Sequence, residues 1–267
     1  MDLFEYWKQT HTAPYHFPMD KTVWEQSMEE DMDSDGRILF DSLHTAMIPG
    51  GMIVYGHTAF GFDGNGEISH NVHYPVIRDL AFETPEAGKQ LLNSALSHFK
   101  EEACIYAFFH YFGMSACARH GKLHESQPHV HDLLLEHGFN VEHENVYYAK
   151  ELSGAVCEPQ ISLIWKEENA GNCREFAAIS EGSEVCWGQI HFLPQGNIAY
   201  LRWIYVDDKV QHQGIGSKVM NSLFDHLYQC GIRRFDTDTA LNNTAAQHYY
   251  EKMGFINKGI TRSYLKE

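Results

Sequence analysis

The stretch Gln211–Met220, QHQGIGSKVM, places two glycines, Gly214 and Gly216, at the start of an amphipathic run. Glycine allows the backbone to approach a ligand without a Cβ clash, and the N–H groups at a helix N-terminus bind anions. The chemistry predicted here is binding of a phosphate or pyrophosphate. Two tyrosines, Tyr249 and Tyr250, follow in NNTAAQHYYEKMGF, and a tyrosine hydroxyl is able to donate a proton.

Two familiar phosphate-binding loops do not fit this stretch. A P-loop requires G-x-x-x-x-G-K-[ST], whereas Gly216, Ser217 and Lys218 stand in a different order. A Rossmann loop requires a third glycine where Val219 stands, directly after a strand. Asp236 would suit a ribose ligand, but only 31 residues follow it, too few to complete a doubly wound sheet.

The two blocks together resemble the GNAT superfamily of N-acetyltransferases. The loop matches [QR]-x-x-G-x-[GA] at Gln211, Gly214 and Gly216. The second block matches N-x-x-A-x-x-[LYF]-Y-x-x-x-G-F at Asn243, Ala246, Tyr249, Tyr250, Gly254 and Phe255. The resemblance covers about residues 160–267, and the first half resembles the family only in architecture.

The resemblance implies that the anion is the pyrophosphate of acetyl-coenzyme A, bound as a cosubstrate without a metal. The implied cofactor residues are Ile204, Tyr205, Val206, Gln211, His212, Gln213, Gly214, Ile215, Gly216, Ser217 and Asn243. The strand residues would pair through their backbone with the pantetheine amides, and an N–H near Val206 would stabilise an oxyanion. Capping of the last helix is a second role open to Asn243.

Tyr250 stands where the family has a tyrosine near the sulfur, which implies a general acid for the leaving thiolate. A buried structural tyrosine is the alternative, and for Tyr249 packing is the preferred interpretation. The general base is not readable, because the strand YLRWIYV carries no Asp or Glu. His191 is a candidate base, with a plain core or surface histidine as the alternative, and Asp207 and Asp208 are interpreted as solvated loop residues.

The composition excludes several classes of protein. The chain has 267 residues, of which 43% are hydrophobic and 21% charged, as in globular proteins. No apolar run reaches the ~18–20 residues of a membrane span, and MDLFEYWKQT lacks the pattern of a secretory signal. Six scattered cysteines indicate a cytoplasmic protein. The net charge of −16 argues against nucleic acid as a partner.

Several local elements are predicted from residue types and spacing. In the first half we predict a hairpin-type turn at DGNG, a helix over EAGKQLLNSALSHFKEE, a strand over IYAFFHYF (residues 105–112) and a helix that ends at LLLEHGF. The first of these helices places Leu91, Leu92, Ala95 and Phe99 at helical spacing. In the second half, a helix from about Gly214 to Cys230 places Ile215, Val219, Leu223 and Leu227 on one stripe, and Gly231 is predicted to stop it in a left-handed conformation.

Both halves show three strands, a long helix, a strand, and a helix that ends in Gly-Phe, at Gly138-Phe139 and at Gly254-Phe255. Such repetition indicates a duplicated unit. We therefore predict an α/β (α+β) fold of two tandem GNAT-like domains, 1–155 and 156–267. Each is expected to be a mixed, mostly antiparallel sheet with splayed central strands flanked by helices.

The first half is predicted to be a degenerate copy. At the positions of the glycine loop it has Glu83, Glu86 and Gly88, and at the position of Tyr250 it has Leu134. Two carboxylates would repel a pyrophosphate, and leucine donates no proton.

The acidic charge is concentrated in this first half. Residues 1–155 hold 9 Lys and Arg against 23 Asp and Glu, and residues 156–267 hold 11 against 13. The second half is also short, because only about 14 residues separate Gln160 from Arg174, where the family places two helices over the acceptor pocket. We expect the first domain to supply that wall, which would suit a cationic amine. The alternative is an acidic half that is only a solvated surface.

Two metal-like motifs are weak. DMDSDGRILFDS aligns with a calcium loop but has Ser42 in place of the bidentate glutamate. Four nearby histidines, His124, His129, His131 and His137, have no cysteine at zinc-site spacing. No metal site is predicted from either motif.

The predicted function is acetyl-coenzyme-A-dependent N-acetylation of a small-molecule primary amine. Transfer would be direct, in a ternary complex, with Tyr250 as general acid. The alternative is a non-catalytic sensor that binds acyl-coenzyme A. No motif identifies the acceptor, the acyl chain length or the oligomeric state.

Overall fold

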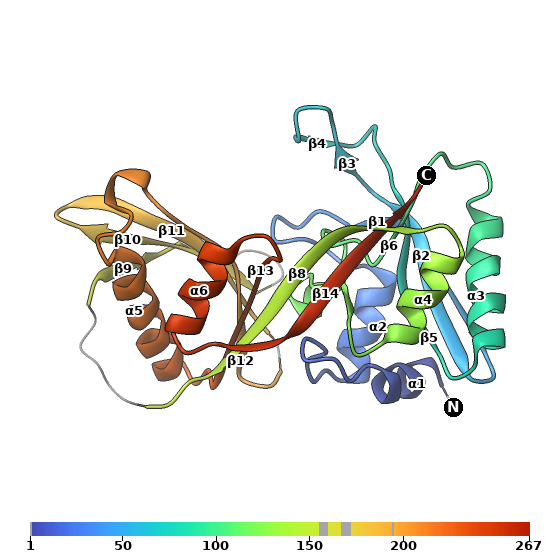
Figure 1. Cartoon of the computed structure of the whole chain (residues 1–267), viewed down its shortest axis with the longest axis horizontal. Coiled ribbons are helices and arrows are strands. Elements are labelled where there is room, and N and C mark those ends of the chain that lie inside the picture. Colours follow the sequence, from blue (N-terminus) through green and yellow to red (C-terminus); the bar gives the residue numbers. More distant parts are fainter. Residues whose placement is uncertain (1, 155–159, 167–171, 194) are drawn as a thin grey trace. The chain divides into compact units, whose positions relative to one another are not determined.

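The computed structural model describes residues 2–154, 160–166, 172–193 and 195–267. The chain divides into two compact units (Figure 1). Unit 1 comprises Met1–Asp33, Arg37–Glu144 and Ile260–Glu267, and unit 2 comprises Ser34–Gly36 and Asn145–Gly259. The boundary between the predicted domains, at residues 155 and 156, lies outside the described residues and stays a prediction.

Unit 1 contains a mixed sheet with the strand order β1-β2-β5-β6-β14. Only β5 and β6 pair in parallel. The strands are β1 (Phe40–Ile48), β2 (Gly51–Thr58), β5 (Pro75–Phe82), β6 (Ile105–Ala107) and β14 (Ile256–Lys266). The short strand β7 (Leu123–His124) pairs with β14, and the predicted DGNG turn joins β3 (Gly61–Phe62) to β4 (Ile68–Ser69).

Two predicted helices share a core with this sheet, α3 (Pro85–His98) and α4 (Pro128–Glu136). The stripe predicted for α3 is buried, at Leu91, Leu92, Ala95 and Phe99. The strand predicted over residues 105–112 is shorter than expected, since β6 ends at Ala107 and Phe108 takes a left-handed φ of 53°. That conformation breaks an extended backbone. A 3₁₀ turn, η1 (Ser115–Cys117), precedes β7.

The N-terminal segment forms two helices that the sequence interpretation did not predict. They are α1 (Leu3–Thr10) and α2 (Lys21–Glu29). Asp2 and Asp20 cap them, each accepting a hydrogen bond from the backbone N–H three residues further on. The helices contact each other through aromatic rings, those of Phe4, Trp7 and Trp24.

Unit 2 contains a sheet with the order β8-β13-β12-β11-β10-β9, in which only β12 and β13 are parallel. The strands are β8 (Asn140–Glu151), β9 (Ser162–Trp165), β10 (Cys173–Ser180), β11 (Ser183–Phe192), β12 (Ile198–Val206) and β13 (Arg234–Ala240). Strand β9 ends at Trp165 and β10 begins at Cys173, so seven residues separate the two strands.

The helices α5 (Ile215–Gln229) and α6 (Thr244–Lys252) pack on this sheet around one core. The predicted stripe on α5 is fully covered, because Ile215, Val219, Leu223 and Leu227 are all buried. Gly231 ends the helix with a left-handed φ of 87°, as predicted.

Strand β8 completes the sheet of unit 2 from a position before the predicted boundary. Its residues pair with β13 from Asn145↔Ala240 to Glu151↔Arg234. A fragment that began at residue 156 would therefore lack a strand of this sheet.

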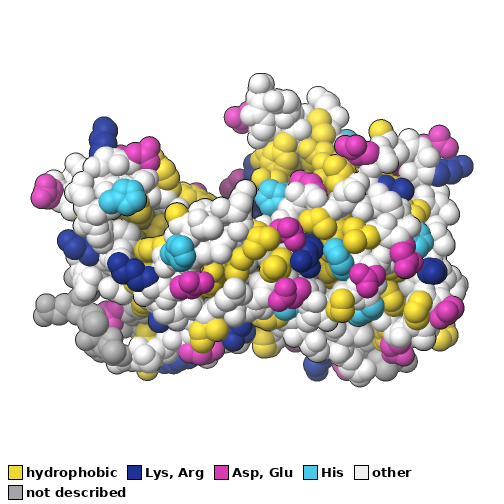
Figure 2. Space-filling model, viewed as in Figure 1, with side chains coloured by type: hydrophobic (Ala, Val, Ile, Leu, Met, Phe, Trp, Pro, Cys, Tyr) yellow, Lys and Arg dark blue, Asp and Glu magenta, His cyan; other side chains and the backbone are white. Residues whose placement is uncertain are grey.

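The surface of unit 1 carries dispersed charge on the face seen in Figure 2, where Asp and Glu side chains are scattered among other residues. This pattern is typical of a solvated surface. Among the described helices, none is both long enough and apolar enough to cross a membrane.

Candidate functional site

The central strands of unit 2 separate at one end. β12 and β13 pair from Ile198↔Arg234 to Leu201↔Thr237, and the pairing then stops although both strands continue. A cavity of about 820 Å³ is lined by the separated ends of the two strands and by the segments that follow them. The predicted splay of the central strands is confirmed.

A β-bulge places one residue of β12 at this cavity. In the ladder with β11, Gln189 pairs with Trp203 and Ile190 with Leu201, so Arg202 is the extra residue. A bulge interrupts the alternation of side chains and re-aims them. Arg202 and Trp203 both line the cavity.

Beyond the bulge, the backbone of β12 turns hydrogen-bonding groups away from β11. The Asp207 N–H donates to the Val185 carbonyl. Because hydrogen-bonded and non-hydrogen-bonded pairs alternate in an antiparallel ladder, the groups of Ile204 and Val206 face the edge that β13 has left. The side-chain amide of Gln211 already donates to the Val206 carbonyl at 2.9 Å. This is the edge that was predicted to pair with pantetheine.

The glycine loop forms another wall of the cavity. It follows η2 (Asp208–Val210), and Gly214 stands at the start of α5 with a left-handed φ of 80° that favours glycine. No side chain caps α5, so the N–H groups of its first turn are available to an anion. Cavity-lining residues of this segment are Gln211, His212, Gly214, Gly216 and Ser217.

Tyr249 ties α6 to the start of α5. Its hydroxyl donates to the Gly216 carbonyl at 2.7 Å. Burial raises the pKa of Tyr249, so the hydroxyl stays protonated and continues to donate. The contact supports the packing role predicted for this residue, although its ring also lines the cavity.

Asn243 caps α6, since its side-chain oxygen accepts a hydrogen bond from the Ala246 N–H at 3.2 Å. It also lines the cavity. The capping role predicted for Asn243 is confirmed, and its place in the lining keeps the ligand role open.

Tyr250 lines the same cavity and is only 6% exposed. Burial raises its pKa, a hydrogen bond with the Thr237 side chain lowers it, and the charge of Asp238 raises it, with a net increase. A phenol with a raised pKa is protonated at neutral pH. Tyr250 is therefore present as a proton donor at the cavity wall.

Asp238 is the carboxylate that the sequence interpretation missed. It lies on β13 and lines the cavity. Tyr200, buried on β12, donates to its carboxylate at 2.8 Å, and burial is the main cause that raises the pKa of Tyr200 well above its usual value. The signal available in the sequence was RRFDTDTA, where period-two alternation places Asp236 and Asp238 on one face.

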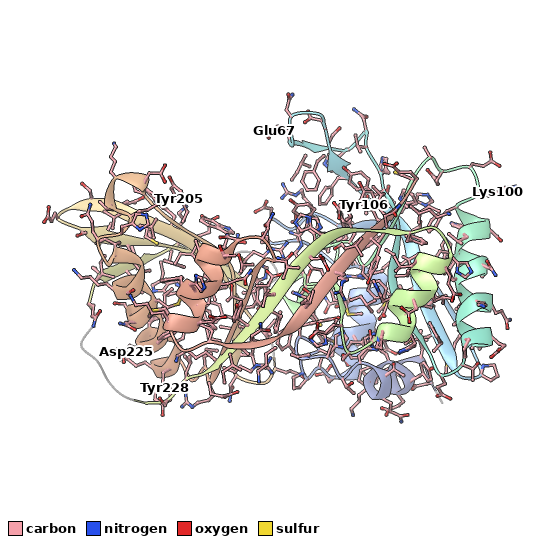
Figure 3. The ribbon with its side chains drawn as sticks, viewed as in Figure 1. Glu67, Lys100, Tyr106, Tyr205, Asp225 and Tyr228 are labelled. Atoms are coloured by element: carbon pink, nitrogen blue, oxygen red, sulfur yellow. The ribbon has the colours of Figure 1, made fainter. Side chains whose placement is uncertain are left out.

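Three predicted cofactor residues have side chains elsewhere. Tyr205, which is labelled in Figure 3, is 48% exposed, and its ring stacks on that of Trp187. The Gln213 amide donates to the Lys209 carbonyl, and Ile215 lies in the core. Contacts of these residues with a cofactor would run through their backbone.

His191, the candidate base named from the sequence, does not line the cavity, and neither do Asp207 and Asp208, which were interpreted as solvated loop residues. His191 is 3% exposed on β11, opposite Tyr200. Asp207 accepts a hydrogen bond from the Lys209 N–H, and Asp208 accepts one from the Gln211 amide. These placements favour structural roles for all three.

In unit 1 the connection from β5 to α3 corresponds to the connection from β12 to α5, which contains the glycine loop, but the two connections differ in structure. Two residues separate β5 from α3, whereas eight separate β12 from α5. Thr84 caps α3 with its side chain. Gly88 serves packing, because a Cβ there would lie 2.8 Å from Phe82 and 2.9 Å from Leu133. Leu134 is fully buried.

The weak metal motifs have structural partners. Three of the four histidines form hydrogen bonds: His124 with Ser126, His131 with Tyr264, and His137 with the Leu133 carbonyl. The fourth, His129, packs edge-on against the Phe82 ring. In the calcium-like stretch, Asp31 pairs with Arg78, and Asp33 with Arg37. Within the described residues, neither set forms a group that would hold a metal.

Residues 135–255 match the model of the Acetyltransferase (GNAT) family. The match spans β8 to β13 with α5 and α6. Over this stretch the chain is similar to GNAT acetyltransferase domains. GNAT proteins use acetyl-coenzyme A as cosubstrate, so the activity that the family implies is acyl-coenzyme-A-dependent acetyl transfer.

Solved GNAT structures share the fold over both units. The tandem GNAT protein from the clavulanic acid biosynthesis pathway is 11% identical with a TM-score of 0.61, over 97% of this chain and 91% of that one. The glucosamine N-acetyltransferase region of a fungal multi-domain GH3 β-N-acetylglucosaminidase is 11% identical with a TM-score of 0.63. The match covers 99% of this chain and 37% of that one.

A GCN5-related N-acetyltransferase from Sphaerobacter thermophilus gives 12% identity and a TM-score of 0.51, over 82% of this chain and 80% of that one. A comparison with curated proteins found no match. Likeness at these identities shows the fold, and it confirms the predicted fold class of tandem GNAT-like units.

Proposed function

We propose that unit 2 transfers the acetyl group of acetyl-coenzyme A to a primary amine of a small molecule. One observation carries this proposal: a single cavity is lined by the glycine loop, by the freed edge of β12, and by Tyr250 and Asp238. A phosphate cradle, a strand edge and a proton donor beside a proton acceptor are what amine acetylation requires.

The residues present suit the coenzyme. The first turn of α5, from Gly214 to Ser217, offers N–H groups to a pyrophosphate, and the backbone of Ile204 and Val206 offers a strand edge to the pantetheine amides. The volume of about 820 Å³ is that of a small-molecule site. Acetyl-coenzyme A would supply an acetyl group activated as a thioester.

The side chains divide the proton transfers between them. Asp238, oriented by Tyr200, accepts a proton from the amine, whose nitrogen then forms a bond to the acetyl carbon. As the carbon–sulfur bond breaks, Tyr250 donates its proton to the departing sulfur. No cysteine is found among the described residues that line the cavity, which favours direct transfer over a cysteine-bound intermediate.

The charges of the lining favour an amine that is protonated in solution. The carboxylate of Asp238 attracts an ammonium group, and Arg202 and Lys252 place positive charge on the same cavity, suited to the phosphates of the coenzyme.

The test uses the full chain, acetyl-coenzyme A and a panel of small primary amines. Coenzyme A and acetylated amine are followed by chromatography and mass spectrometry, because the exposed Cys230 would react with thiol reagents. We expect at least one amine to be acetylated. Tyr250→Phe should lower kcat by ~10²-fold, and the matched control Tyr228→Phe, away from the cavity (Figure 3), should not.

Two results would contradict the proposal. Tight binding of acetyl-coenzyme A without acetylation of any amine would favour the sensor role. An unchanged rate for Tyr250→Phe would remove the tyrosine from the mechanism.

A further inference from the structure

Unit 1 contains a group of three potential metal ligands outside the site described above. His110 follows β6, and Glu142 and His143 are consecutive residues near the start of β8. One ligand atom of each lies within 4.8 Å of the other two. Among the described residues, this is the one group of three or more His, Cys, Asp or Glu side chains that converges in this way.

The convergence departs from ordinary strand geometry. Consecutive residues of a strand point to opposite faces, yet Glu142 and His143 both approach His110. The Nδ1 atom of His110 lies 3.7 Å from a carboxylate oxygen of Glu142, and the rings of His110 and His143 stack with centroids 4.4 Å apart. Two neighbouring residues of β8 therefore turn toward one imidazole.

The group offers one carboxylate in a partly desolvated place, since the Glu142 side chain is 28% exposed and the His110 side chain less. A cation bound at this carboxylate would replace hydration that the protein has partly removed.

We propose that His110, Glu142 and His143 bind a divalent transition-metal ion, of which zinc is the best match. Two imidazoles and one carboxylate form a ligand set that zinc uses, with water in the fourth position. Calcium and magnesium prefer oxygen ligands, so two imidazoles disfavour them. The sequence prediction of no metal considered other histidines and did not examine these three residues.

Binding needs only a local adjustment. Ligands about 2.0–2.1 Å from a tetrahedral zinc stand roughly 3.3 Å apart, close to the 3.7 Å between His110 and Glu142. The two imidazole planes differ by 20°, so one ring must rotate to aim its nitrogen at a shared ion. His143 is exposed and has room to rotate, whereas the His110 side chain is only 13% exposed. The ion would tie the segment after β6 to β8.

The test is titration of the full chain, freed of metal by a chelator, with Zn²⁺ by calorimetry and with Co²⁺ by visible absorption. We expect one equivalent to bind, with the intense d–d bands of four- or five-coordinate cobalt. Glu142→Gln keeps the shape of the side chain, and His143→Ala removes an exposed ring. Each should weaken binding by at least the ~10–100-fold that loss of an outer-shell partner produces.

The matched control is His73→Ala, which removes a histidine that faces a single carboxylate, that of Asp41 at 3.3 Å. It should bind as the unaltered chain does. Equal affinity in Glu142→Gln and His143→Ala would overturn the proposal, as would the absence of a one-equivalent site in the unaltered chain. Near-ultraviolet circular dichroism verifies that each variant is folded.

Discussion

The two units place an arginine at the same point of the same kind of bulge and use it differently. The register of β2 with β5 shifts between Val54 and Tyr55, which leaves Arg78 as the extra residue, as Arg202 is in β12. Arg78 is 5% exposed and pairs with the buried Asp31. Arg202 lines the cavity. The same type of β-bulge thus directs an arginine into the core of unit 1 and into the cavity of unit 2.

The volume of the cavity next to the bulge also differs between the two units. The cavity next to Arg78 and Asp79 measures about 40 Å³, against about 820 Å³ in unit 2. In unit 1, side chains of the N-terminal segment, among them Trp7 and His11, lie next to the bulge. His11 pairs with Asp79 at 2.7 Å. In a sheet of this kind, a site forms only where no segment fills the gap between the parallel strands.

The strand register extends the comparison to single residues. Ile77 pairs with Ala107 in unit 1 as Leu201 pairs with Thr237 in unit 2. The next residue is therefore Phe108 in one unit and Asp238 in the other. A buried ring replaces the carboxylate to which we assign the proton-accepting role.

The largest expected effect is on catalysis in unit 2. Asp238→Asn should lower kcat/KM by about 10²-fold, because the amide accepts no proton from the ammonium form of the amine. Part of the rate should return at high pH, where the amine loses its proton unaided. The measurement is a pH–rate profile, and Asp225→Asn on α5 (Figure 3), away from the cavity, is the control. An unchanged profile would exclude Asp238 as the base.

The second effect separates the two bulge arginines. Arg78→Met should lower the free energy of unfolding by roughly 3–5 kcal/mol, since it leaves the carboxylate of Asp31 buried without its charge partner. Arg202→Met should cost much less stability and mainly raise the KM for acetyl-coenzyme A, since the arginine is assigned to the phosphates of the coenzyme. Urea denaturation and steady-state kinetics on both variants test this contrast, and equal losses of stability would contradict it.

A third prediction contrasts two glycines. Gly88→Ala should destabilise the protein by about 1–3 kcal/mol, because the new Cβ meets the side chains of Phe82 and Leu133, with the KM for acetyl-coenzyme A unchanged. At Gly214 a Cβ meets nothing within 4 Å, but φ is 80°, so Gly214→Ala should strain the loop and raise that KM. Thermal unfolding and kinetics distinguish them. A raised KM in Gly88→Ala would contradict the contrast, because it would mean that the start of α3 also affects the binding of acetyl-coenzyme A.

The smallest expected effect is a pH dependence of stability caused by His16, which lines the small cavity of unit 1. Burial, followed by the charges of His11, His120 and His124, lowers the pKa of His16 well below its usual value. The unfolded chain then binds the additional proton below pH ~6.5, so stability should fall as the pH drops below that value, by up to ~1.4 kcal/mol per pH unit. His16→Phe should flatten this dependence. Hydrogen exchange of residues 2–20 between pH 7 and pH 5 measures it, and an equally steep loss in the variant would exclude His16 as the cause.

The sequence was sufficient where a local pattern determines the outcome. The stripe from Ile215 to Leu227, the stop at Gly231 and the duplicated order of elements follow from spacing and turn residues. Strand partners are not local, so the division of β8 and β14 between the units was missed. Asp238 was missed because the search for a base covered β12 and His191 of β11, whereas the splay brings the end of β13, on the other side of β12, to the same cavity.

The path of β14 has a consequence for synthesis of the chain. Residues 264–266 pair with β6, and Thr261 pairs with His124 of β7, so the sheet of unit 1 is completed by residues that follow unit 2 along the chain. Domains generally fold in the order in which they emerge from the ribosome. Here unit 1 emerges first but cannot close its sheet until residues 260–266 have been synthesised. A chain that stopped before residue 260 would therefore leave unit 1 with an open strand edge.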